Sequence, residues 1–220
     1  MRPMASRRPR RARLSGPQRR ARILAAAADA FAAHGYHAAS IREIAQMAGV
    51  TKPVLYDHFA SKEHLYVALI EGVRDALTGT TAVRMASRLP VEARLRAAVD
   101  AFFGYVETNP SAAKVLFTPP EGEPAVVAAA LRVQQEATAR LAALLGAEAD
   151  LVPGEADARA LRLELFTEFL KRGLHGLAIW WAAHPQVPRT ALVEAVMQIT
   201  WAGLGAQFQP SRDRDAPRVR

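Results

Sequence analysis

The chain has 220 residues, of which 50% are hydrophobic and 23% charged, and it contains no cysteine. This length suits one or two folded domains with a sizeable core, and the absence of cysteine excludes disulfides and cysteine-ligated metals. No apolar run reaches the roughly 18 residues of a membrane-spanning helix, so we expect none.

The net charge of +8 is unevenly divided along the chain. Residues 1–62 hold 12 Lys and Arg against three Asp and Glu, residues 63–208 hold 13 against 16, and residues 209–220 hold four against two. A basic block joined to a slightly acidic body predicts a module that binds polyanions. Charge alone leaves nucleic acid and an anionic membrane surface both open.

The first residues resemble a secretory signal, because nine arginines precede Ile23 and an alanine-rich run follows. Asp29 interrupts that run, however, and Ile23, Ala27 and Phe31 recur with helical spacing. We therefore predict a disordered basic arm over residues 1–16 that leads into an amphipathic helix.

From Pro17 onward, successive segments show the apolar periodicity of helices, and Gly and Pro residues separate these segments. No segment alternates as a strand would. The sequence predicts an all-α fold of about nine helices, with an N-terminal three-helix head and a larger C-terminal helical domain. The expected boundaries are a head over residues 17–62, a ligand-binding and dimerisation domain over residues 63–208, and a disordered tail over residues 209–220.

Residues 40–59 have the pattern of a helix-turn-helix. Ser40 and Glu43 have the spacing of a capping box, so a helix is expected to begin directly after Ser40. Gly49 suits the left-handed conformation that ends a helix, and Thr51 is expected to cap a second short helix with Pro53 in its first turn. In a helix-turn-helix the second helix enters the major groove of DNA. Generic helix pairs share this pattern, so the spacing alone leaves DNA binding open.

Residues 35–65, GYHAASIREIAQMAGVTKPVLYDHFASKEHL, resemble the signature of the TetR family of repressors. The shared points include Gly35-Tyr36, the run from Ala48 to Thr51, and His58-Phe59. Two residues depart from the family pattern: Ala39 stands where Thr is usual, and Pro53 stands where Gly is frequent. So many fixed points over about thirty residues favour DNA binding far more than the spacing does.

The resemblance implies a set of DNA contacts. Phosphate contacts are expected from Ser40, Thr51, Tyr56, His58 and Lys62. Base contacts are expected from Arg42, Lys52, Pro53 and Val54, the last two through thymine methyl groups. The arginines of the arm are expected to attract DNA non-specifically, with entry into the minor groove as the alternative.

The resemblance also places a dimer interface on residues 157–183 and 188–205. The first segment is apolar on two sides, which predicts a core on one side and a partner on the other. The residues expected at the interface are Leu170, Gly173, Leu174, Leu177 and Trp181. The alternative is a central helix of a monomeric bundle.

A ligand pocket in residues 63–208 should be apolar with few polar groups. Its expected lining is Phe102, Phe103, Phe117, Phe166 and Trp180, with Gln134 and Thr138 orienting a hydrophobic effector. Ordinary core packing is the alternative for each aromatic residue.

These features predict a DNA-binding transcriptional regulator of the bacterial cytoplasm: a homodimeric repressor of a near-palindromic operator that a small hydrophobic ligand releases. No catalytic or metal-binding cluster is evident, so we expect no enzymatic activity, no metal and no cofactor. The alternatives are an all-α enzyme, a ligand-blind architectural DNA binder and, for the sign of regulation, an activator.

Overall fold

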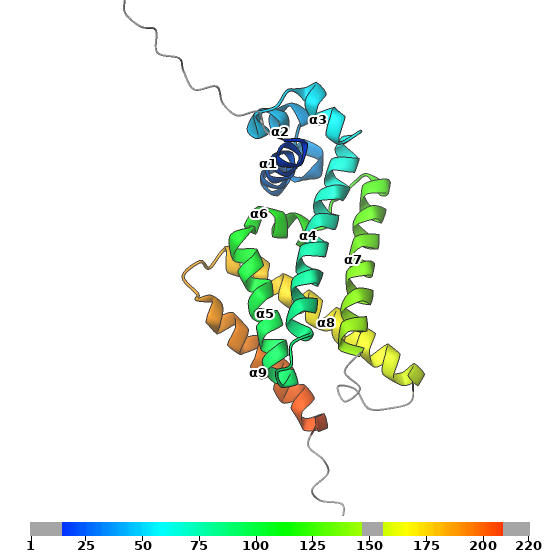
Figure 1. Ribbon diagram of the computed structural model, residues 1–220, viewed down its shortest axis with the longest axis vertical. Helices are drawn as coiled ribbons and strands as arrows, with labels where there is room; N and C mark the ends of the chain where they lie inside the picture. The colour runs from blue at the N-terminus through cyan, green and yellow to red at the C-terminus, as the bar shows by residue number, and fades with distance from the viewer. Residues whose placement is uncertain (1–14, 147–155, 209–220) are drawn as a thin grey trace, which may run out of the picture.

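The computed structural model describes residues 15–146 and 156–208 (Figure 1). Within these residues the chain forms nine helices and no strand, which confirms the predicted all-α fold. The helices are α1 (Gly16–Ala38), α2 (Ile41–Ala48), α3 (Lys52–His58), α4 (Lys62–Met85), α5 (Val91–Thr108), α6 (Pro110–Phe117), α7 (Pro124–Gly146), α8 (Ala156–Ala182) and α9 (Arg189–Phe208). The predicted tail and all but the last two residues of the predicted arm lie outside the described residues.

Helices α1, α2 and α3 form a small head at one end of the molecule (Figure 1). Ser15 and Gln18 begin α1 with reciprocal side-chain caps, which satisfy two backbone donors at its N-terminus. Gly35 interrupts α1 with φ 74° and ψ 173°, so the breaker expected there is a bend within one long helical segment. The head core is built from the fully buried Ile23, Ile44 and Leu55.

The body is held to the head by α4, which runs from the head along the length of the body (Figure 1). Helix α4 packs against α1 at its start and against α5, α6 and α7 along its length. The boundary predicted between residues 62 and 63 falls at the first residue of α4, so one continuous helix joins the two parts. Helix α8 packs against α7, and α9 packs against α5.

Candidate functional site

The turn between α2 and α3 is made by Gly49, which has φ 66° and ψ 34°. Its N–H donates to the Gln46 carbonyl at 3.1 Å, and the next N–H, of Val50, donates to the Ala45 carbonyl at 3.0 Å. A Cβ at Gly49 would also lie 3.0 Å from Nη2 of Arg22. The left-handed backbone therefore requires glycine here, and α2, the turn and α3 form the predicted helix-turn-helix.

The two predicted caps differ in the structure. Ser40 Oγ accepts a hydrogen bond from the Glu43 N–H at 3.1 Å, as expected. The Glu43 carboxylate does not return to Ser40 but lies 3.2 Å from Nε2 of His34, joining α2 to α1. Thr51 occupies the N-cap position of α3 without a side-chain cap, contrary to prediction. Its exposed hydroxyl makes no capping bond and stays available to an outside acceptor or donor such as a phosphate.

The first turn of α3 presents an exposed surface. Thr51, Lys52 and Pro53 are exposed, and Tyr56 one turn later is 43% exposed with its ring centroid 5.9 Å from Nζ of Lys52. The opposite side of α3 is fixed because Leu55 is fully buried. Of the other predicted contacts, Ser40 and Arg42 of the neighbouring α2 are exposed and Val54 is half-buried. The structure thus gathers most of the predicted DNA-binding residues on α2 and α3.

Lys62 has an internal role that the sequence pattern did not indicate. Its Nζ donates to the His37 carbonyl at 2.9 Å and lies 4.6 Å from the Tyr36 ring centroid. Burial lowers the pKa of Lys62, opposed by the charge of Glu123. The phosphate contact predicted for Lys62 therefore competes with bonds that hold α4 to the end of α1. His58, another predicted phosphate contact, is half-buried.

A cavity of about 90 Å³ lies in the body and is lined by α4, α5, α6, α7 and α8. Eight of its twenty lining residues are leucines, and Met85, Ala98, Val99, Phe102 and Ala137 are the other apolar ones. Few side chains in the wall carry polar groups: Arg74, Thr78, Thr81, Gln134, Thr167, Lys171 and His175. An apolar wall with few polar groups is typical of a ligand site.

Lys171 is 7% exposed and is fully paired. Its Nζ donates to Oγ1 of Thr138 at 2.6 Å, to the Gln134 carbonyl at 3.1 Å and to Oε2 of Glu168 at 2.8 Å. Burial on its own would raise the pKa of Glu168, but hydrogen bonds from Lys171, Thr138 and Arg172 outweigh it and lower that pKa to about 2. All three ammonium donors are used, as a buried cation requires.

Acid is expected to weaken this cluster. The pKa of Glu168 is about 2 in the folded chain and near 4.5 when unperturbed, so its contribution is present above pH ~4.5 and is lost as the pH falls toward 2. The Glu168 side chain is 34% exposed, so solvent screens the interaction and the free energy of unfolding should fall by about 1 kcal/mol between pH 6 and pH 3. Urea unfolding of the wild type and of Glu168→Gln at both pH values measures this loss. Equal acid sensitivity in the two proteins would contradict the assignment.

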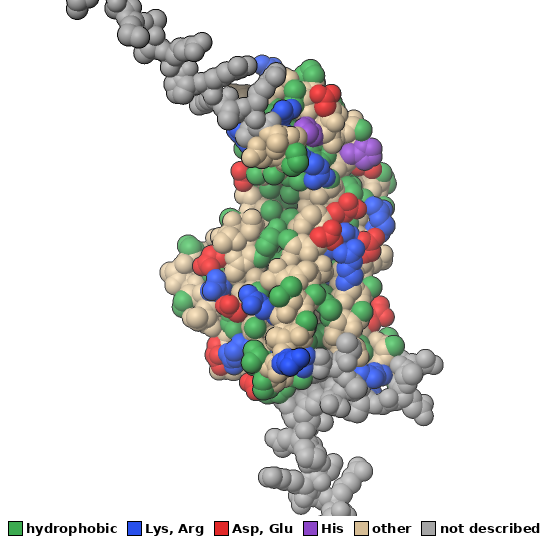
Figure 2. All heavy atoms as spheres, in the orientation of Figure 1, with side chains coloured by type: hydrophobic (Ala, Val, Ile, Leu, Met, Phe, Trp, Pro, Cys, Tyr) green, Lys and Arg blue, Asp and Glu red, His purple; other side chains and the backbone are tan. Residues whose placement is uncertain are grey.

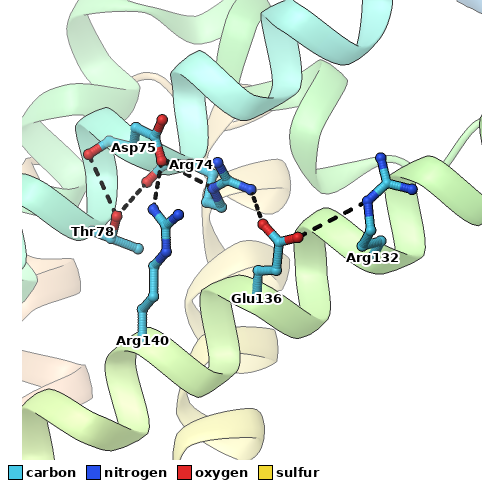
Figure 3. A network of polar contacts seen from close by, with 6 residues as sticks. All are labelled: Arg74, Asp75, Thr78, Arg132, Glu136 and Arg140. Carbon is cyan, nitrogen blue, oxygen red and sulfur yellow. Dashed lines mark hydrogen bonds and ion pairs between the residues drawn. The ribbon is translucent and has the colours of Figure 1, made fainter.

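Arg74 also lines the cavity and joins α4 to α7 (Figure 3). Its guanidinium donates to Oδ1 of Asp75 at 3.0 Å and forms an ion pair with Glu136. Asp75 also accepts from Arg140 at 2.6 Å, and Arg132 lies 3.9 Å from Glu136. Figure 2 shows blue and red side chains gathered over α4 and α7. The charge of Arg74 is therefore balanced by acids on both helices.

His175 differs from the other polar residues of the wall. Its ring stacks on Phe117 with centroids 4.0 Å apart and on Phe102 at 6.1 Å. Burial, followed by the charge of Lys171, lowers the pKa of His175 to about 3, so the ring is neutral. Among the described residues, neither of its ring nitrogens has a hydrogen-bond partner.

The predicted pocket residues separate into two groups. Phe102 and Gln134 line the cavity, and the Gln134 amide donates to the Leu116 carbonyl at 2.8 Å. The other five do not line it. Phe103 is fully buried in the core, Thr138 pairs with Lys171, and Phe117 stacks on His175. Phe166 packs against the small cluster that contains Leu163, and Trp180 is 45% exposed with its ring stacked on His184. The sequence prediction missed Arg74, Lys171 and His175. Thr167, Lys171 and His175 recur every four residues, a signal that was available.

The predicted interface residues lie mostly on the inner face of α8. Leu170, Leu174 and Leu177 are half-buried against the protomer's own core, and Trp181 is 9% exposed. Only Gly173 lies on the exposed face. That outer face carries large apolar side chains: Leu161, Leu165, Phe169 and Trp180. Helix α8 is thus apolar on two sides, as predicted, and four of the five residues assigned to the partner side face inward. The contact of the outer face with a partner stays a prediction.

Helix α6 lies between the cavity and the head. Leu116 of α6 lines the cavity, while Nζ of Lys114 donates to the Ala32 carbonyl of α1 at 2.8 Å. Just beyond α6, the Glu121 carbonyl lies 2.6 Å from Nε2 of His37 at the end of α1. Gly122 has φ 99°, and a Cβ there would lie 2.4 Å from that same nitrogen. A shift of α6 would therefore displace α1 through these contacts.

In residues 15–146 and 156–208, no helix is long and apolar enough to cross a membrane. The same residues hold no group of three His, Asp or Glu side chains placed to bind a metal ion.

Comparison with known proteins extends these findings. Residues 23–69 match the family model described as bacterial regulatory proteins, tetR family. The HTH-type transcriptional activator FasR of Mycolicibacterium smegmatis is 35% identical over 201 residues, which cover 87% of this chain and 85% of that protein.

Solved structures share the fold. The fatty acid degradation regulator FadR of Bacillus halodurans superposes with a TM-score of 0.72 and 24% identity, covering 84% of this chain and 98% of that one. FadR of Bacillus subtilis, solved in complex with stearoyl-CoA, superposes with a TM-score of 0.70 and 17% identity, covering 83% and 98%.

Proposed function

This chain belongs to the TetR family of bacterial regulatory proteins, and we propose that it acts as a cytoplasmic homodimer that binds a near-palindromic operator and is released by an acyl-type ligand. It is a DNA-binding regulator of transcription rather than an enzyme. The observation that carries the proposal is the exposed first turn of α3, whose opposite side is buried in the head. The body separately contains an apolar cavity.

The dimer proposal rests on the outer face of α8. Leu161, Leu165 and Phe169 follow one another at steps of four, and all are more than half exposed. Gly173, Gly176 and Trp180 continue the stripe. A helix that is apolar on both sides needs a second partner, and another copy of the same helix supplies a self-complementary one. Such a dimer can hold two α3 helices about 34–36 Å apart, the spacing of successive major grooves.

The ligand proposal rests on the cavity and on its place next to α4 and α6. Its volume of about 90 Å³ is well below the ~300 Å³ at which ligand pockets usually begin, so a ligand must move the lining helices apart. Two of those helices contact α1 of the head. The stearoyl-CoA bound by the Bacillus subtilis regulator and the fatty acid regulation named for its Bacillus halodurans counterpart suggest a long acyl chain. Ligand binding then weakens DNA binding by favouring the displaced arrangement.

Whether the protein represses or activates transcription depends on where its operator lies relative to the promoter. The sequence predicts a repressor, whereas the Mycolicibacterium smegmatis relative is named an activator. A dimer that blocks the promoter represses, and the same dimer bound upstream can activate. Transcription from the native promoter, with and without the protein, distinguishes the two.

Selection of bound sites from random double-stranded DNA tests the proposal. A homodimer should enrich a near-palindrome with half-sites about 10 base pairs apart or a multiple of that spacing. Adding a long-chain acyl-CoA should then release the selected site. If the enriched sites have no two-fold symmetry, the dimeric arrangement is wrong.

Lys52→Ala should reduce sequence discrimination. Lys52 is exposed in the first turn of α3, so its loss should remove about 1–3 kcal/mol of preference for the selected site over a scrambled one. The measurement is affinity for both DNAs at one salt concentration. Deletion of residues 1–14, which spares the Ser15 cap, is the control and should weaken both DNAs alike. Equal loss on both DNAs in Lys52→Ala would show a phosphate contact instead.

A further inference from the structure

The polar groups of the cavity wall are almost all committed within the protein. The hydroxyls of Thr78, Thr81 and Thr167 donate to backbone carbonyls of their own helices, at 2.9, 3.0 and 2.6 Å. The Gln134 amide donates to Leu116, and Lys171 uses all three of its donors. A ligand that needs a donor from the threonines or from Lys171 must therefore first break an existing hydrogen bond, whereas the Gln134 amide keeps a second N–H and its Oε1 outside the bond to Leu116.

His175 is the polar wall residue that makes no such bond. Its ring is held by stacking on Phe117 and Phe102, and no hydrogen bond to either nitrogen is formed within the described residues. A neutral imidazole has one N–H donor and one acceptor nitrogen. A ligand that pairs the imidazole therefore gains a hydrogen bond without breaking one within the protein.

The charges around the cavity indicate which ligand group fits. Lys171 is compensated by Glu168, which lies 2.8 Å away. On α4, Arg74 is paired with Asp75 and Glu136. A carboxylate that enters the cavity loses its hydration and has to compete with Glu168, Asp75 and Glu136 for these two cations. An uncharged carbonyl oxygen carries no such penalty and accepts one hydrogen bond from the imidazole.

We propose that His175 is the specificity-determining residue of the cavity and that it donates a hydrogen bond to an uncharged acyl carbonyl, as in an ester or thioester. The inference rests on the proposed acyl-type ligand and adds which atom of the ligand is recognised. The apolar wall around it takes the chain, and Phe117 and Phe102 fix the plane of the ring.

The test compares two probes that differ only at the carbonyl. Hexadecanoyl-CoA carries the carbonyl, and S-hexadecyl-CoA, its thioether, has a methylene in its place. The full-length wild type should bind the thioester about tenfold more tightly than the thioether, as expected for one net hydrogen bond. In His175→Phe, which keeps an aromatic ring on Phe117, the two should bind equally. His175→Gln, which keeps a donor, should restore part of the preference.

Methyl hexadecanoate and free hexadecanoate test the charge argument, and the ester should bind more tightly. Binding of the thioether by His175→Phe shows that the variant is folded. If the wild type does not distinguish thioester from thioether, or if the preference persists in His175→Phe, the role of His175 is overturned while the ligand proposal stands. If neither CoA probe binds a wild type that still binds its selected DNA, the acyl ligand and the role of His175 both fall, and the DNA-binding proposal survives.

Discussion

Replacing Phe169 by glutamate is expected to split the proposed homodimer and to lower affinity for a two-half-site operator by at least about 100-fold. The Phe169 side chain is 65% exposed in the protomer and lies in the middle of the outer apolar stripe of α8. A carboxylate there would be buried without a partner when two copies meet, which disfavours association. Each monomer then binds one half-site and loses the gain from linked binding. Sedimentation gives the oligomeric state, and titration with operator DNA gives the affinity.

Leu131→Glu is the matched control for this variant. Leu131 is a 53% exposed leucine on α7, away from the stripe, so the same kind of change should leave dimer and affinity intact. Dimerisation itself stabilises the wild type, so the two proteins are compared at a dilution at which the wild type is monomeric. Under that condition, Phe169→Glu should unfold at the same midpoint as the wild type. A Phe169→Glu protein that remains dimeric would place the interface on another face.

The head could be predicted from the sequence because its structure is fixed by local rules. Ser40 begins α2 and Gly49 ends it, and each acts on backbone groups within a few residues of itself. Thr51 shows the limit of such rules, because its hydroxyl stands at the cap position without bonding to the backbone. Lys62 shows another limit: its partner, the His37 carbonyl, lies 25 residues earlier in the chain.

The body could be predicted only as a set of helices. The apolar periodicity of α8 indicated two apolar sides, and the structure shows one buried in the protomer and one exposed. Periodicity does not tell which side meets the protomer's own core. Leu174 and Phe169 are both large apolar residues, so the sequence does not tell which of them is buried. Only the packing of α8 on α6 and α7 shows that Leu174 faces the core and Phe169 faces outward. Lys171 was missed for the same reason, since a lysine in an apolar helix becomes informative only when Glu168 and Thr138 are seen around it.

Phe103→Ala is expected to lower the free energy of unfolding by about 3–5 kcal/mol. Phe103 has no exposed surface, and its ring packs edge-on against Phe102 and Trp181, with centroids 5.2 and 5.9 Å apart. It therefore joins α5 to α8, and the truncated side chain leaves a void that these helices cannot close. Chemical denaturation at neutral pH, with the slope checked for two-state behaviour, measures the loss.

Phe102→Ala, one residue earlier, is the comparison that separates a core residue from a cavity residue. Phe102 is 9% exposed and lines the existing cavity, so its loss widens a space that is already there. It should cost less stability than Phe103→Ala and should change binding of a long-chain acyl-CoA, because the chain gains room beside His175. Phe103→Ala should leave the affinity of the folded protein for that ligand nearly unchanged. If both variants altered ligand affinity equally, the sequence-based assignment of both rings to the pocket would be the better one, and the core role of Phe103 would fail.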